Sequence, residues 1–214
     1  MNTRLKPIHL TRYFNSPAAL SSAEGWHPSM DHVSGKLPRA ETKHWGIPFR
    51  FGPEAVTEPG LIVVRGATEV RVPVGKTATH LCIAHFCNST DAMFGNAGGG
   101  EPMGEYVLRF TDGAEHVQPI RRRFETNPFN VGWGGSPFVA QPSAMPVPWD
   151  YASAPAMAWG QLQTGVTYAG GSACQFWIYA LENPRPDVPI KSITFRATSE
   201  QPLAILGMTL YEGP

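Results

Sequence analysis

Three apolar runs near the end of the sequence constrain the fold most. They cover residues 174–181, 190–198 and 203–211, are rich in β-branched and aromatic residues, and are each bounded by Pro, Asn, Asp or Ser. This pattern predicts consecutive strands of an all-β domain. A last strand this close to the end of the chain needs partners to be stable, so the pattern favours a closed two-sheet antiparallel β-sandwich or jelly roll.

Composition agrees with short strands joined by many turns. The 214 residues include 22 Gly and 21 Pro, and only 16% are charged. This length fits a single sandwich domain spanning residues 1–214, in which we expect residues 1–50 to wrap across the end of the sandwich. Seventeen basic residues balance seventeen acidic ones. The chain therefore lacks the field that attracts nucleic acid or an anionic membrane surface.

The N-terminal residues and the cysteines bear on where the protein works. The first residues include basic side chains but no apolar stretch of the length a secretory signal needs, and no run is long enough to span a membrane. We expect a soluble protein, cytoplasmic as written or exported as part of a longer chain. Because the cysteines are odd in number (Cys82, Cys87 and Cys174) and two lie in apolar runs, we expect buried thiols and no disulfide.

Local patterns predict particular strands. Residues 78–87 have two largely apolar faces, which predicts a central strand. Residues 105–120 predict a hairpin, with Asp112-Gly113 as a type I′ turn. Further strands are expected at residues 8–14, 44–51 and 161–168.

Several short motifs occur in an order typical of a known superfamily. They are Tyr13-Phe14-Asn15, Gly25-Trp26, residues 46–49 (GIPF), 72–75 (VPVG), 106–113 (a Tyr to Asp-Gly hairpin) and 182–193 (Glu-Asn-Pro followed by an Ile-rich strand). In this order the chain resembles the galactose-binding-domain-like β-sandwiches that accompany bacterial glycoside hydrolases and other glycan-active enzymes. The resemblance implies carbohydrate binding or scaffolding of a glycan-active catalytic domain, without naming the sugar.

Tryptophans and polar residues in irregular segments are the candidate ligand-binding groups. The C–H groups of a pyranose ring pack on an indole face, and its hydroxyls bond to charged or amide side chains at the rim. The candidate residues are Trp26, His27, His44, Trp45, Arg122 and Trp133. In the alternative interpretation, the tryptophans cap the ends of the core and the run of three arginines beginning at Arg121 alternates along an edge strand.

Metal and cofactor sites have weaker patterns. His80 and His85 leave a strand on opposite faces, so they cannot share one ion without a bulge. A second set, His27, Asp31 and His32 with His44, could converge at the mouth of the sandwich. No zinc spacing is present. We expect no cofactor, although a structural Ca²⁺ held by carbonyls and carboxylates is compatible with this fold.

Two alternatives to a binding module remain open. One is a small polysaccharide lyase or glycoside hydrolase with His27, His44, Tyr151 or Arg122 in its cleft. Catalysis by paired carboxylates would draw on Glu41, Glu101, Asp150 or Glu182, none of which has a local signature. The other alternative is a structural domain that forms homo-oligomers through a flat sheet face. We expect a non-catalytic module whose partner is a carbohydrate or a catalytic domain.

Overall fold

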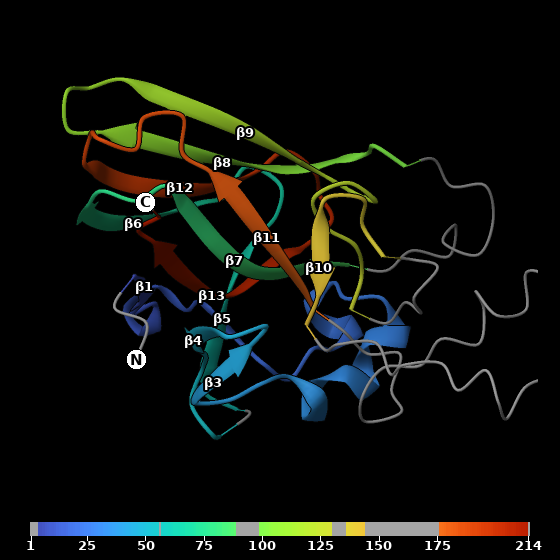
Figure 1. Cartoon of the computed structure of the whole chain (residues 1–214). Coiled ribbons are helices and arrows are strands. Elements are labelled where there is room, and N and C mark those ends of the chain that lie inside the picture. Colours follow the sequence, from blue (N-terminus) through green and yellow to red (C-terminus); the bar gives the residue numbers. More distant parts are fainter. Residues whose placement is uncertain (1–3, 56, 89–98, 130–135, 144–175, 214) are drawn as a thin grey trace, which may run out of the picture.

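The fold is all-β, with antiparallel sheets packed face to face (Figure 1). The computed structural model describes residues 4–55, 57–88, 99–129, 136–143 and 176–213. The predicted fold class, an antiparallel β-sandwich, is confirmed. The strand expected at 161–168 lies outside the described residues.

Two sheets and one separate hairpin account for the described strands. The larger sheet has the order β10-β11-β7-β13-β5-β2, with β1 also paired to β13. Its strands are β1 (Leu5–Ile8), β2 (Ser16–Pro17), β5 (Pro59–Val64), β7 (His80–Cys87), β10 (Ala140–Pro142), β11 (Trp177–Glu182) and β13 (Leu203–Tyr211). The smaller sheet, in the order β6-β12-β8-β9, contains β6 (Glu69–Lys76), β8 (Pro102–Phe110), β9 (Glu115–Arg121) and β12 (Ile190–Ala197). The hairpin consists of β3 (Glu41–His44) and β4 (Ile47–Arg50).

Strand β7 lies in the middle of the larger sheet, as its two apolar faces predicted. It pairs with β11 on one side and β13 on the other. Ile83 and His85 face the smaller sheet, while Ala84 and Phe86 face the opposite side, and all four are fully buried. A strand buried on both faces has no polar alternation, which explains its continuous apolar sequence.

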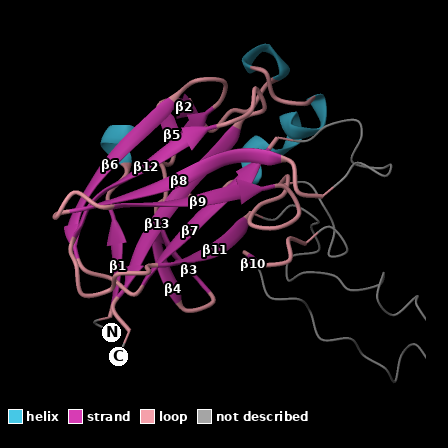
Figure 2. Ribbon diagram, turned by 90° about the horizontal axis from the view of Figure 1, so that it is seen from above, coloured by secondary structure: helices cyan, strands magenta, loops and turns pink. Residues whose placement is uncertain are grey.

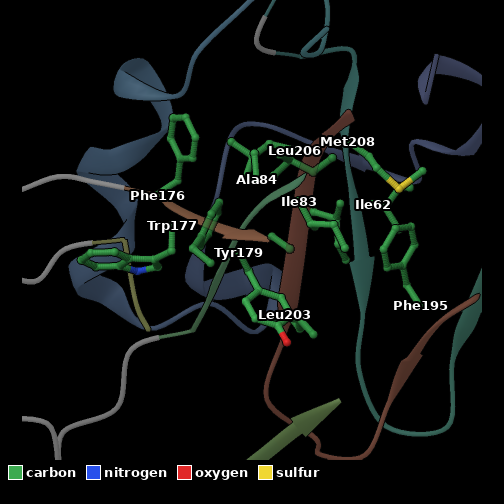
Figure 3. Close-up of a cluster of buried hydrophobic side chains, with 14 of the residues drawn as sticks. Ile62, Ile83, Ala84, Phe176, Trp177, Tyr179, Phe195, Leu203, Leu206 and Met208 are labelled. Carbon is green, nitrogen blue, oxygen red and sulfur yellow. The ribbon is translucent and has the colours of Figure 1, made fainter. Parts of the chain in front are cut away.

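The core between the two sheets is built from large side chains on both. Tyr106 of β8 and Phe195 of β12 lie edge to face with ring centroids 5.0 Å apart. Figure 3 shows part of the buried cluster, with Trp177 and Tyr179 of β11 and Ile83 of β7 among the residues drawn. All of these residues are at least nine-tenths buried. Burial of an aromatic side chain contributes roughly 1.5–3 kcal/mol, so this layer supplies much of the stability.

The N-terminal segment covers the outer face of the larger sheet (Figure 1). It contains three 3₁₀ helices, η1 (Thr11–Tyr13), η2 (Ser22–Glu24) and η3 (Pro28–Lys36), followed by the β3-β4 hairpin. A Cβ atom added to Gly207 of β13 would come within 3.3 Å of both Phe49 and Phe51, so the hairpin packs directly on the sheet. The segment therefore forms a third layer.

Two expectations for this segment are wrong in detail. Residues 8–14 do not form one strand, because β1 ends at Ile8 and the Tyr13 N–H bonds to Leu10 O at 2.8 Å, starting a helical turn. Residues 44–51 are also not one strand. Trp45 and Gly46 form a two-residue turn with φ angles of 54° and 78°, the positive values that a type I′ turn requires.

The hairpin predicted at residues 105–120 is confirmed as β8 and β9, but its turn is not type I′. Only Gly113 has a positive φ, 91°, in that turn. The Gly113 N–H bonds to Phe110 O and the Phe110 N–H to Ala114 O, while Asp112 Oδ1 accepts from the Ala114 N–H. Because the side chain of Asp112 stabilises this wider loop, a single left-handed glycine is sufficient.

The outer face of the smaller sheet carries cross-strand ion pairs. Arg196 of β12 lies 3.4 Å from Glu69 of β6 and 3.4 Å from Glu105 of β8. Arg109 of β8 pairs with Glu115 of β9. All of these side chains are partly solvated, so each pair contributes little stability. This face alternates between buried and charged residues, as expected where one side of a sheet meets water.

The two ends of the described chain meet at one end of the sandwich (Figure 2). The Glu212 N–H bonds to Arg4 O at 2.8 Å, and Lys6 Nζ lies 2.6 Å from the Glu212 carboxylate. η2 and η3 lie at the opposite end (Figure 2).

Candidate functional site

The tip of the β3-β4 hairpin presents Trp45 to solvent. Its side chain is 43% exposed, and its backbone lies in the left-handed region, which costs a bulky residue about 1–3 kcal/mol. The indole Nε1–H donates to Pro142 O of β10 at 2.6 Å. This bond fixes the orientation of an exposed ring. It also occupies a carbonyl on the edge strand of the larger sheet, which protects that edge from pairing with another chain.

His44 anchors the hairpin beneath this ring. Its Nδ1 lies 2.8 Å from Ser143 O, and because a carbonyl can only accept, Nδ1 carries the proton. Nε2 then accepts from the Thr42 hydroxyl at 3.1 Å. The imidazole lies edge-on to Phe176, with ring centroids 4.9 Å apart. Burial lowers the pKa of His44, opposed by the bond to Ser143 O, so the ring is neutral and acts as a fixed support.

Trp26 and His27 connect the N-terminal segment to the end of β7. Trp26 is 3% exposed and packs on Phe86 with centroids 5.6 Å apart. The backbone N–H of His27 bonds to Asn88 Oδ1 at 2.9 Å, and its Nδ1 accepts from the Ser29 N–H that begins η3. Both residues therefore have structural contacts that explain their presence.

Arg122 points into the protein from the loop after β9. It is 3% exposed, with Nη1 donating to Asn88 O at 3.3 Å and Nη2 lying 3.8 Å from Met103 Sδ. Its Nε lies 2.8 Å from the Glu101 carboxylate, at an angle too far from linear for a hydrogen bond. The guanidinium thus ties three chain segments together, and its side chain offers no open surface to a ligand.

The six predicted ligand-binding residues are not all brought together. His44 and Trp45 lie side by side on the hairpin against residues 142 and 143. Trp26 and His27 lie at the end of β7, and Arg122 is buried between chain segments. Trp133 lies outside the described residues, as do Asp150 and Tyr151. Only the hairpin pair combines a fixed geometry with an accessible aromatic surface.

Sequence reasoning missed a buried polar network between the sheets. His85 Nδ1 lies 2.6 Å from the Tyr106 hydroxyl, and His85 Nε2 lies 2.9 Å from Glu125 O. Because the carbonyl accepts, Nε2 is protonated and Nδ1 accepts from Tyr106. The side chain of Glu125 turns back to accept from the Arg121 backbone N–H at 2.8 Å. A histidine on the inward face of an apolar strand was the only local signal.

Burial dominates the pKa values in this network. It lowers the pKa of His85 to about 4 and raises the pKa of Tyr106 well above its usual value. Both groups are therefore neutral near pH 7, as fully buried groups with neutral partners should be. The network can hold the loop of residues 121–127 in place, but its groups are sealed from solvent.

The described residues contain no group of three or more His, Cys, Asp or Glu side chains placed to hold a metal ion. The convergence considered for His27, Asp31, His32 and His44 is not found there, and the side chain of His32 lies outside the described part. A Ca²⁺ bound mainly by backbone carbonyls stays a prediction.

The two described cysteines are expected to be unreactive in the native protein. Both are free and buried, and burial raises the pKa of Cys82 to about 11 and of Cys87 to about 12. Because the thiolate is the nucleophile, alkylation at pH 8 should label neither residue until the chain unfolds. Peptide mapping after labelling distinguishes them from Cys174. Native labelling of either cysteine at the rate seen in denaturant would contradict this burial.

No known family model, curated protein or solved structure matches the chain. Within the part of the chain that the structure describes, no helix is long and apolar enough to cross a membrane. The argument for function therefore depends on the chain's own residues.

Proposed function

We propose that this protein is a carbohydrate-binding accessory module, of the galactose-binding-domain-like kind that acts with a glycan-active enzyme, and that Trp45 is its binding platform. One observation carries the proposal: a bulky residue occupies a strained backbone position at a hairpin tip, where its ring is exposed and held by a hydrogen bond. Asn or Gly would occupy that position without strain. Strain retained at an exposed residue favours a functional role.

The chemistry of the hairpin suits a sugar. The C–H face of a pyranose packs on an indole, and a ring already fixed in orientation loses little conformational entropy on binding. Lys43 and Gln141, both exposed, lie within two residues of Trp45 and next to Pro142 respectively. They can supply hydrogen bonds to hydroxyls at the rim.

The contacts of the candidate catalytic residues favour binding over catalysis. Glu41 pairs with Arg50 at 3.0 Å on the hairpin, and Glu101 pairs with the buried Arg122. The ring nitrogens of His44 and Nδ1 of His27 are engaged with neighbouring groups. Two unpaired carboxylates flanking a cleft, as a glycosidase needs, do not occur among these residues.

The outer face of the smaller sheet does not favour the oligomerisation alternative. Interfaces that hold stable oligomers have apolar centres depleted of charge. This face instead carries Arg196 and Arg109 in partly solvated ion pairs.

The proposal predicts that binding depends on the Trp45 ring. On a glycan array, the wild-type protein should bind at least one polysaccharide, and Trp45→Ala should weaken the affinity at least about tenfold. Trp45→Phe should keep most of the binding because it keeps an aromatic face.

The matched control is Val117→Ala on β9, because Val117 is exposed to nearly the same extent, 44%. Its binding should equal that of the wild type. Equal binding by Trp45→Ala and wild type on every glycan that binds would remove Trp45 as the platform.

A further inference from the structure

A pocket of about 240 Å³ opens at the edge of the larger sheet, away from the Trp45 hairpin. It lies between β2, η2 and the turn from β5 to β6. Its apolar lining comes from Pro17, Val63 and Trp26, and its polar lining includes Ser16, Glu24 and Arg65. None of its lining residues belongs to β3, β4 or β10. The pocket is thus distinct from the proposed platform.

The guanidinium of Arg65 is held in place at this pocket. Its Nη1 donates to the backbone carbonyl of Glu24 at 2.7 Å. It also lies against Gly25, where an added Cβ would come within 2.4 Å of Nη1 and where φ is +82°. A residue with a side chain would therefore both strain the backbone and displace the arginine. A guanidinium has five N–H donors, so this anchoring leaves others to meet a ligand.

Trp26 contributes an indole N–H without a protein acceptor. No described residue accepts a hydrogen bond from its Nε1, although the side chain is 3% exposed. The nitrogen is not sealed from solvent, since it is not among the buried side-chain nitrogens that lack a partner. A buried tryptophan N–H usually has a partner. Since Trp26 lines the pocket, a ligand oxygen bound there is the natural acceptor.

The charges around the pocket select the ligand. The carboxylate of Glu24 shares the lining with Arg65, and Glu200 lies 3.3 Å from the position of a Cβ on Gly66, the residue after Arg65. An anion would meet these carboxylates as well as the guanidinium. A hydroxyl can accept from Arg65 and donate to Glu24, so a ligand with adjacent hydroxyls uses both groups.

We infer that this pocket binds a single neutral hexopyranose ring. Its volume is below the roughly 300–1,000 Å³ of pockets for drug-sized ligands, which fits one ring and not a longer chain. The apolar side chains would contact the C–H face of the ring, while Arg65, Glu24 and the Trp26 N–H bond its hydroxyls. This inference does not depend on sugar binding at Trp45.

The Trp26 indole resonance reports on the pocket directly. In ¹H–¹⁵N spectra, assigned with Trp26→Phe, this cross peak should shift saturably as glucose, galactose or mannose is titrated through the millimolar range. Arg65→Gln should weaken that binding about tenfold or more, because a charged donor is lost. Glu24→Gln should also weaken it, while keeping the backbone carbonyl that anchors Arg65.

Matched arms separate this site from its alternatives. Arg109→Gln, an arginine on β8, should bind like wild type, and so should Trp45→Asn, even if that variant abolishes binding to polysaccharides. No shift with any neutral sugar would overturn the inference, as would an equal shift in Arg65→Gln. A shift produced only by glucuronate or inorganic phosphate would also overturn it, because the pocket would then be an anion site.

Discussion

Replacing Trp26 with alanine is expected to lower the free energy of unfolding by about 3–5 kcal/mol. Trp26 is 3% exposed, and its ring lies 5.6 Å from that of Phe86, on the outer face of β7. Removing the indole leaves a cavity between the N-terminal layer and the larger sheet. It also weakens the neighbouring contacts of Asn88, which bonds to both His27 N and Gly25 O.

Urea denaturation measures this effect, with Trp45→Ala as the matched substitution at an exposed tryptophan. Trp45→Ala should cost about 1 kcal/mol, because it removes one hydrogen bond and little buried surface. A cost below about 1 kcal/mol for Trp26→Ala would mean that the N-terminal layer is not packed on the sheet. The result also matters for binding studies, since Trp26→Ala tests folding and not a ligand contact.

Acidification from pH 7 to pH 4 is expected to remove about 3 kcal/mol of unfolding free energy through His85 alone. Burial lowers the pKa of His85 to about 4 in the folded protein, against 6.5 for an unperturbed histidine. The folded state therefore requires the neutral ring, and the unfolded state takes up a proton first as the pH falls. The stabilisation is complete above pH 6.5, is lost progressively down to about pH 4, and does not decrease further below that.

Other groups also titrate over this range, so the variant His85→Asn provides the comparison. Asn can still donate to Glu125 O or accept from Tyr106, but it does not titrate. Its unfolding free energy should be lower than that of wild type at pH 7 and should change less between pH 7 and pH 4. Parallel pH profiles for the two proteins would show that His85 is not sealed in a neutral state.

The strands of the sandwich could be predicted because their residues obey local rules. The apolar run of β7 and the runs of β12 and β13 reflect burial in sheets, which depends on neighbouring residues along the chain. Turns were predicted less well. Asp112-Gly113 has the sequence of a type I′ turn and forms a wider loop, whereas Trp45-Gly46 has the backbone of that turn without its usual residues.

The candidate site depended on contacts between distant residues, which a single sequence does not report. Trp26 and Trp45 are both tryptophans next to a glycine, yet one is buried against Phe86 and the other is exposed. Arg122 was predicted to face a ligand and instead joins Asn88, Met103 and Glu101 inside the protein. Local patterning cannot distinguish these outcomes, because burial of an irregular segment is decided by tertiary packing.

The variant Trp45→Asn, measured for both stability and glycan binding, tests the proposed function most directly. Asn adopts positive φ easily, so relief of backbone strain should offset the lost bond to Pro142 O and keep the unfolding free energy within about 1 kcal/mol of wild type. The account predicts that this well-folded variant no longer binds the polysaccharide that wild type binds. Wild-type affinity in the same variant would contradict it.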